Sequence, residues 1–161
     1  MSTEIATGQA SNSELNGGDQ KNKLSLWLVD DDVESRQLCA NILRTDGGFE
    51  CPRQFGSAEA VIATLSMSPG PALLLLEARL PGMNGATAVK QIHSLSPGTR
   101  VFLFSTFFEA ERAAEARAGG ASGYFRKCDF AQVLQSMRPS PGSAVPSANA
   151  LAEYQSDSIR S

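Results

Sequence analysis

The chain has 161 residues, of which 42% are apolar, and its formal charge at pH 7 is −3. This length predicts a single domain that is large enough to bury a core. The sequence carries no excess of basic residues for nucleic acid or an anionic membrane surface, and no apolar run approaches the roughly 20 residues that span a bilayer. Because Cys39, Cys51 and Cys128 are far apart and lack metal-ligand spacing, we expect free thiols in a reducing cytoplasm.

Both ends of the chain are polar or rich in small residues. Residues 1–23 are rich in Ser, Thr, Asn, Gly and Gln, and residues 139–161 in Ser, Ala and Pro. Such segments bury too little apolar surface to offset the entropy of ordering. We therefore expect a disordered N-terminal arm (1–23), a folded domain (24–138) and a disordered C-terminal tail (139–161). A tail of this length cannot form a DNA-binding domain, so we expect any output to pass through partner proteins.

The folded part begins with an apolar run over 24–29, which predicts a strand and ends in three adjacent carboxylates. The third of these, Asp32, can cap a helix over 33–45, because its oxygen can accept free N–H groups of the first turn. Capping leaves Asp30 and Asp31 unexplained. Since hard divalent ions prefer clustered carboxylates, we interpret this pair as linked to a cation. The apolar residues of this segment recur at helical spacing, which predicts the helix: Val33, Leu38, Ile42 and Leu43.

The middle of the chain predicts two further strands. The run 49–55 contains Pro52, which cannot donate to a ladder and so favours an edge strand. Ser57 then caps a helix that ends near Leu65. Four consecutive leucines, 73–76, are typical of a strand buried on both faces of a parallel sheet, and Glu77 stands where this strand ends. The next helix is predicted to place four residues on one face: Ala86, Val89, Ile92 and Leu95.

The last part of the chain completes a repeated strand–helix pattern. A fourth strand over 100–104 is followed by Ser105 and Thr106, a helix is predicted over 108–118, and a short strand over 123–126 precedes Lys127. A final helix carries Phe130, Val133, Leu134 and Met137. Five alternations predict a parallel sheet with helices on both faces. The acids, hydroxyls and lysine that follow the strands then share one edge, where open α/β sheets bind ligands.

With these motifs in order, the chain from Leu24 to about Met137 resembles the receiver domain of bacterial two-component response regulators. The resemblance implies an α/β, flavodoxin-like, doubly wound five-stranded sheet with strand order 2-1-3-4-5. It also implies a signalling module, rather than an enzyme, that takes a phosphoryl group from a histidine kinase onto an aspartate at the end of the third strand. Histidine kinases or other signalling proteins are the partners that it implies.

The resemblance assigns roles to the residues at this edge. Asp30 and Asp31 match the acidic pair that holds Mg²⁺, and Arg79 matches the residue whose backbone carbonyl is another ligand; Glu77 could also reach the ion, or Lys127 could displace it. Ser105 matches the switch hydroxyl that bonds the phosphoryl group, and Lys127 matches the lysine that pairs with its charge. Tyr124 matches the aromatic residue whose rotation reports the switch, and Gly85 the glycine that follows the active loop.

Two positions depart from the family pattern. Glu77 replaces the phospho-accepting aspartate, which adds one methylene, or about 1.5 Å of reach. Since a misplacement of ~1 Å can cost about 10²-fold in phosphoryl transfer, Glu77 is expected to attack poorly and to reach instead toward Ser105 and Lys127. Cys128 stands where the family usually has proline. Because a cis bond before a non-proline residue costs about 2.5–4 kcal/mol, we expect a trans Lys127–Cys128 bond and a somewhat shifted lysine.

Several interpretations remain open at this stage. Glu77 could be a structural acid neutralised by Lys127, or a partial mimic of the phosphorylated state. A third interpretation is that the protein is phosphorylated, either on Glu77 or on a nearby acid such as Asp31. The leading interpretation is a receiver-like module with impaired or absent phosphorylation that acts through protein–protein interaction. The alternative is a phosphotransfer-competent single-domain response regulator. A nucleotide-binding protein is disfavoured because acids, not glycines, follow the first strand.

Four other side chains have simpler expectations. His93 is expected on the surface and Cys39 in the core. Of Phe107 and Phe108, one is expected to pack into the core while the other covers it; the alternative is an exposed aromatic docking point beside the fourth helix. For Tyr124, half-buried packing competes with the switching role.

Overall fold

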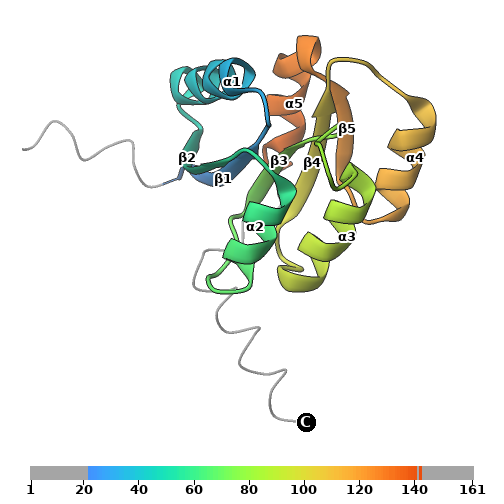
Figure 1. Cartoon of the computed structure of the whole chain (residues 1–161). Coiled ribbons are helices and arrows are strands. Elements are labelled where there is room, and N and C mark those ends of the chain that lie inside the picture. The colour runs from blue at the N-terminus through green and yellow to red at the C-terminus, as the bar shows by residue number, and fades with distance from the viewer. Residues whose placement is uncertain (1–21, 141, 143–161) are drawn as a thin grey trace, which may run out of the picture.

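Five parallel strands in the order β2-β1-β3-β4-β5 form the centre of the computed structural model, which describes residues 22–140 and 142 (Figure 1). Most of the predicted arm and tail therefore lies outside the described residues, and their disorder stays a prediction. The strands are β1 (Leu24–Val29), β2 (Phe49–Phe55), β3 (Leu73–Glu77), β4 (Arg100–Ser105) and β5 (Gly123–Arg126). The predicted strand order is confirmed.

Among the described residues, four helices connect the strands, and a fifth follows β5: α1 (Val33–Asp46), α2 (Ala58–Leu65), α3 (Gly85–Leu95), α4 (Ala110–Ala118) and, last, α5 (Phe130–Met137). A short 3-10 turn, η1 (Lys127–Asp129), precedes α5. No helix in the described part of the chain is both long and apolar enough to cross a membrane.

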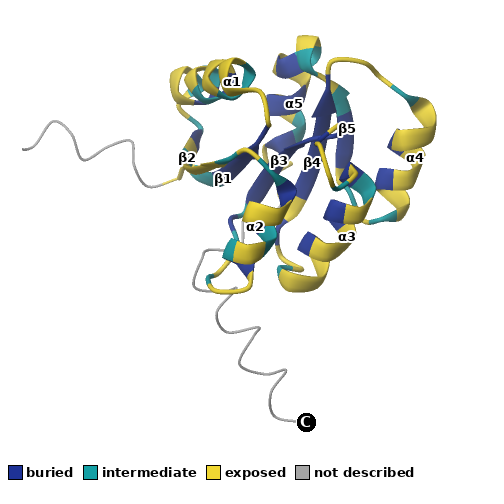
Figure 2. Cartoon of the chain, viewed as in Figure 1, coloured by how far each residue is buried: buried dark blue, intermediate teal, exposed yellow. Residues whose placement is uncertain are grey.

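The core has two layers, one on each face of the sheet (Figure 2). Leu74 and Leu76 of β3 pack with residues of α2, α3 and α4 on one face, whereas Leu73 and Leu75 pack with residues of α1 and α5 on the other. All four leucines are buried, as predicted for a strand covered on both sides. Burying each such side chain contributes about 1.5–3 kcal/mol, so β3 anchors the site residue Glu77 rigidly at its end.

The edge position predicted from Pro52 is confirmed, because β2 ends the strand order and, among the described residues, pairs only with β1. The register between the two strands shifts where Ser25 pairs with Glu50 but Trp27 pairs with Arg53. Two residues of β2, including Pro52, therefore lie opposite one residue of β1. This is the geometry of a β-bulge, which absorbs a residue that has no N–H to donate.

Three helical predictions were partly wrong. In α1 the buried residues are Cys39 and Leu43, whereas Val33 and Leu38 are 54% and 61% exposed, because only a narrow stripe of this helix meets the sheet. In α3 the buried face is Gly85, Ala88, Val89 and Ile92, which leaves Ala86 half-buried and Leu95 exposed at its border. The fourth helix begins at Ala110 instead of residue 108, because Glu109 takes the N-cap position.

Two arginines fix the end of α5 far from the site. Arg100 donates to the carbonyls of Ser136 and Met137, in the last turn of this helix, where a cation also complements the helix dipole. Arg138 forms an ion pair with Asp46, at the end of α1, with an N···O distance of 2.6 Å. The helix that follows Lys127 is therefore tied to both β4 and α1.

Candidate functional site

The acidic turn after β1 is organised by the first turn of α1. Asp32 is the N-cap, as predicted, and accepts a hydrogen bond from the backbone N–H of Ser35 at 2.6 Å. Asp30 is fully buried, and its Oδ1 accepts from the N–H of Asp32 at 3.0 Å. Asp31, between them, is exposed. The three adjacent acids thus have separate environments, and only Asp30 points into the protein.

Lys127 lies at the centre of the site. Its Nζ is 2.7 Å from Asp30 Oδ2, 2.7 Å from Glu77 Oε2 and 2.9 Å from Ser35 Oγ. Burial alone would lower the pKa of this lysine, but the hydrogen bonds to Asp30 and Glu77 outweigh it and raise the pKa above its ordinary value. The ammonium is therefore held in its charged form between two acids. The ammonium also lies over the aromatic ring of Phe104, whose centroid is 5.0 Å from Nζ.

Glu77 is buried, and both of its carboxylate oxygens are engaged. Oε2 pairs with Lys127, and Oε1 accepts from the backbone N–H of Arg79 at 2.9 Å. The carboxylate therefore folds back onto the loop that follows its own strand. The expected approach of Glu77 to Lys127 is found.

The expected Mg²⁺ ligands are not arranged around a common cation position. The oxygens of Asp30 and Glu77 already accept from Lys127 and from backbone or hydroxyl donors, and Asp31 faces solvent. Across the described residues, no group of three or more His, Cys, Asp or Glu residues comes together in a way that could hold a metal ion. In this arrangement the donor set does not fit Mg²⁺, which requires near-octahedral oxygen coordination.

The predicted switch residues lie on β4 and β5, the two strands on one side of β3. Ser105 is buried at the end of β4, where it pairs in register with Arg126, and Thr106 is exposed. Tyr124 is buried rather than half-buried, with 4% of its surface exposed, and burial raises the pKa of its phenol. Its hydroxyl has no hydrogen-bond partner of ordinary geometry among the described residues.

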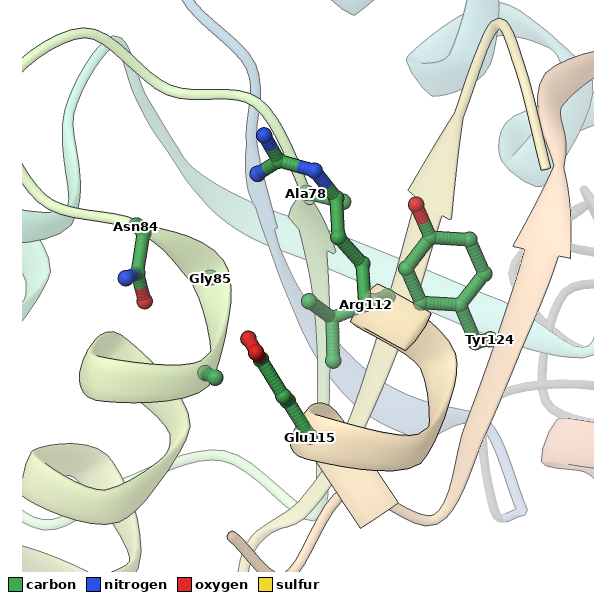
Figure 3. Close-up of a pocket in the computed structure, with 8 residues that line it drawn as sticks. Ala78, Asn84, Gly85, Arg112, Glu115 and Tyr124 are labelled. Carbon is green, nitrogen blue, oxygen red and sulfur yellow. The ribbon is translucent and has the colours of Figure 1, made fainter. Parts of the chain in front are cut away.

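The Tyr124 ring borders a small cavity of about 10 Å³, which has room for one water molecule (Figure 3). Figure 3 shows the ring extending from β5 alongside Arg112 of α4, with Asn84 and Gly85 across the cavity. The start of α3 packs closely on β4 and on the loop after β3, and only a glycine fits at position 85. A Cβ there would lie 2.5 Å from Leu103 Cδ2 and 3.1 Å from the carbonyl oxygen of Ala78. Steric crowding thus explains why a glycine stands at this position after the active loop.

A second set of contacts joins the loop after β3 to the start of α4. Glu109 pairs with both Arg79 and Arg112, and the Arg79 guanidinium lies 6.0 Å from the centroid of the Phe107 ring. Phe107 and Phe108 are 65% and 51% exposed, so the expectation that one of them enters the core is wrong. Phe108 packs edge-on against Tyr124, at 5.6 Å between ring centroids, which explains why it covers the site without entering the core.

Sequence reasoning therefore located most of the residues that meet at this edge but missed some of their partners. Asp30, Glu77 and Lys127 come together, whereas Asp31 is exposed and lines a neighbouring pocket with Arg79, whose guanidinium pairs with Glu109. The missed contributor is Ser35, which bonds both Asp30 and Lys127. A hydroxyl three residues after an N-cap is common, so only the fold could distinguish it. No cis peptide bond occurs in the described residues, so the expected trans Lys127–Cys128 bond is found.

The fold and the site together define a class of protein. A five-stranded parallel sheet in the order 2-1-3-4-5, with a buried acid after β1, an acid after β3, a hydroxyl after β4 and a lysine after β5, is the arrangement of a receiver module. The family model of the response regulator receiver domain matches residues 26–138. The chain belongs to this family.

Individual relatives agree with this assignment. The chain is 33% identical over 101 residues to the DNA-binding transcriptional regulator NtrC of Klebsiella pneumoniae, and 27% identical over 107 residues to the transcriptional regulatory protein YxjL of Bacillus subtilis. These matches cover 63% and 66% of this chain. Among solved structures, the signal receiver domain of the putative response regulator NarL from Mycobacterium tuberculosis superposes with a TM-score of 0.62 at 26% identity. That match covers 72% of this chain and 97% of the receiver domain.

The matched part is only a portion of the regulators. The chain spans 21% of the length of NtrC and 49% of YxjL. The comparison therefore assigns the receiver module, and the DNA-binding activity in the name of NtrC belongs to that protein.

Proposed function

We propose that this chain is a receiver module of two-component signal transduction that accepts a phosphoryl group poorly or not at all and acts through protein–protein interaction. The observation that carries the proposal is the state of Glu77, which replaces the acceptor aspartate. Its Oε2 is 2.7 Å from the Lys127 ammonium and its Oε1 accepts from the Arg79 N–H, so donors hold both oxygens, fix the carboxylate and lower its nucleophilicity. Phosphoryl transfer depends on in-line positioning of the attacking oxygen, and this geometry opposes it.

The rest of the site supports a fixed state of the switch region. Tyr124 is buried beneath Phe108, and the Arg79–Glu109 pair ties the loop after β3 to the start of α4. These contacts hold the two loops together without a phosphoryl group. The carboxylate of Glu77 carries −1, against roughly −1.5 to −2 for a phosphate, so any mimicry of the phosphorylated state is partial. Histidine kinases and other signalling proteins are the proposed partners, in the cytoplasm.

One observation favours the alternative, a phosphotransfer-competent response regulator. Lys127 and Ser105 stand at the ends of β5 and β4, where the family uses a lysine and a hydroxyl to hold the phosphoryl group. A charged lysine beside an acid is part of that machinery. The two functions therefore differ in the reactivity of Glu77 and not in the presence of its neighbours.

Intact-mass spectrometry separates the two functions. The full chain is incubated with acetyl phosphate and Mg²⁺, beside a Glu77→Asp variant and a Glu59→Asp control that shortens an acid on α2. The proposal expects no stoichiometric phosphoryl adduct on the wild-type chain or the control. An adduct on Glu77→Asp alone would show that the added methylene is the block. A stoichiometric adduct on the wild type would overturn the proposal and favour phosphotransfer.

A further inference from the structure

The ammonium of Lys127 has three donors, and three acceptors surround it. These are Asp30 Oδ2 at 2.7 Å, Glu77 Oε2 at 2.7 Å and Ser35 Oγ at 2.9 Å. The lysine side chain is 21% exposed, while the side chains of Asp30 and Glu77 are 0% and 7% exposed. A buried carboxylate without a cation is costly, so this lysine supplies the counter-charge that both acids need.

The remaining oxygens of the two acids are also engaged. Asp30 Oδ1 accepts from the N–H of Asp32, and Glu77 Oε1 accepts from the N–H of Arg79. A divalent ion that ligated either acid through a remaining lone pair would lie close to the Lys127 ammonium, whose positive charge opposes its binding. Mg²⁺ gives up its water reluctantly and demands near-octahedral geometry, so its binding beside this ammonium is energetically unfavourable.

Ser35 makes this arrangement specific. Its hydroxyl donates to Asp30 Oδ2 at 2.7 Å and accepts from Lys127 Nζ, and its backbone N–H is held by Asp32 at 2.6 Å. The side chain of the next residue, Arg36, donates to the carbonyl oxygen of Asp30. The first turn of α1 thus clamps the acidic turn and offers Lys127 a third acceptor. Loss of this hydroxyl would remove one acceptor from Lys127 and one donor from Asp30.

Building on the proposed function, we propose that Lys127 is the resident cation of this site, that Ser35 is the positioning residue that keeps it there, and that the module works without a divalent metal. The structure assigns Ser35 this role because, among the described residues, its hydroxyl bonds both the buried Asp30 and the Lys127 ammonium. Removing either the charge of Lys127 or the hydroxyl of Ser35 then opens the acids to a divalent ion.

Binding of Mn²⁺ to the full chain tests this proposal directly. Free Mn²⁺ is counted by electron paramagnetic resonance in titrations without any phosphodonor. The variants are Lys127→Met and Ser35→Ala. Their matched controls are Lys90→Met, an exposed lysine on α3, and Ser66→Ala, a serine whose hydroxyl bonds only the carbonyl of Ile62 at the end of α2.

The proposal expects no saturable site on the wild type or the controls at millimolar Mn²⁺. Lys127→Met should gain at least tenfold in affinity, and Ser35→Ala about fivefold, the size expected for the loss of one hydrogen bond. The proposal is overturned if the wild type takes one equivalent of Mn²⁺ as tightly as Lys127→Met, or if neither variant gains over its control. If Lys127→Met fails to fold, the comparison of Ser35→Ala with Ser66→Ala decides alone.

These outcomes are independent of the phosphorylation test. A wild type that binds Mn²⁺ tightly yet forms no phosphoryl adduct would remove the role assigned to Lys127 and Ser35 and leave the proposed function standing. A wild type that forms an adduct but binds no free Mn²⁺ would overturn the proposed function and leave the role assigned to Lys127 and Ser35 standing.

Discussion

Replacing Lys127 by methionine should destabilise the protein strongly, because it removes the cation between two buried acids. Methionine keeps most of the side-chain volume, so little of the effect comes from a cavity. Breaking a buried ion pair by removing one partner costs about 3–5 kcal/mol, since it leaves an uncompensated charge. Here Lys127 is 21% exposed and water can reach the vacated position, so we expect a loss of about 2–4 kcal/mol at pH 7.

Urea unfolding followed by tryptophan fluorescence measures this loss. Trp27 is the sole tryptophan of the chain, is 4% exposed and packs against Phe55 with 5.4 Å between ring centroids, so its emission reports unfolding of the core. The control Lys90→Met should change the free energy of unfolding by less than about 0.5 kcal/mol, as surface substitutions usually do. A loss for Lys127→Met below about 1 kcal/mol would show that Lys127 is not the counter-charge that the two buried acids need.

A double-mutant cycle with Glu77→Gln then assigns the loss to the ion pair. Glutamine keeps the shape of the side chain and removes its charge, so it should relieve part of the destabilisation caused by Lys127→Met. We expect a coupling energy of about 1–3 kcal/mol between the two positions. Additive effects would show that Lys127 and Glu77 do not stabilise each other.

Three further predictions follow from the buried groups and the anchors of α5. Tyr124→Phe should leave stability unchanged or raise it by up to about 1 kcal/mol in thermal unfolding, because the hydroxyl that it removes has no partner among the described residues; a clear loss would reveal a missing hydrogen bond. Burial raises the pKa of the Cys39 thiol from 9.0 to about 11, so folding stability should fall as pH rises from 9 to 11. Iodoacetamide should label the exposed Cys128 before the buried Cys39, and equal labelling rates would contradict this. Arg138→Ala should cost about 0.5–1 kcal/mol in urea unfolding by removing the ion pair with Asp46, and no change would mean that solvent screens this pair completely.

The strand pattern was predictable because each strand has a strong local signal. The four leucines of β3 specify a strand covered on both faces, and Pro52 identifies the edge strand, as the structure confirms. The helical faces were less predictable. Val33 and Leu38 fit a helical period but lie outside the stripe of α1 that meets the sheet, which only the angle between helix and sheet determines.

The site was predictable to the level of which residues meet, but not of how they bond. Strand ends placed Asp30, Glu77 and Lys127 at one edge, because parallel strands share it. Side-chain rotamers, which no sequence pattern encodes, determine which acceptors surround Lys127. They also determine which donors hold the Glu77 oxygens and that the Ser35 hydroxyl bridges Asp30 and Lys127. The same holds for Phe108, whose position depends on where α4 begins.

The most direct test of the central claim, that Lys127 and Glu77 are closed on each other, is an NMR titration of the ¹⁵N-labelled chain with Mg²⁺ and beryllofluoride. The backbone amide signals of Arg79, Ser105 and Lys127 should stay in place, because the Lys127 ammonium already neutralises Asp30 and Glu77. Saturable shifts of these signals at millimolar Mg²⁺ would contradict it.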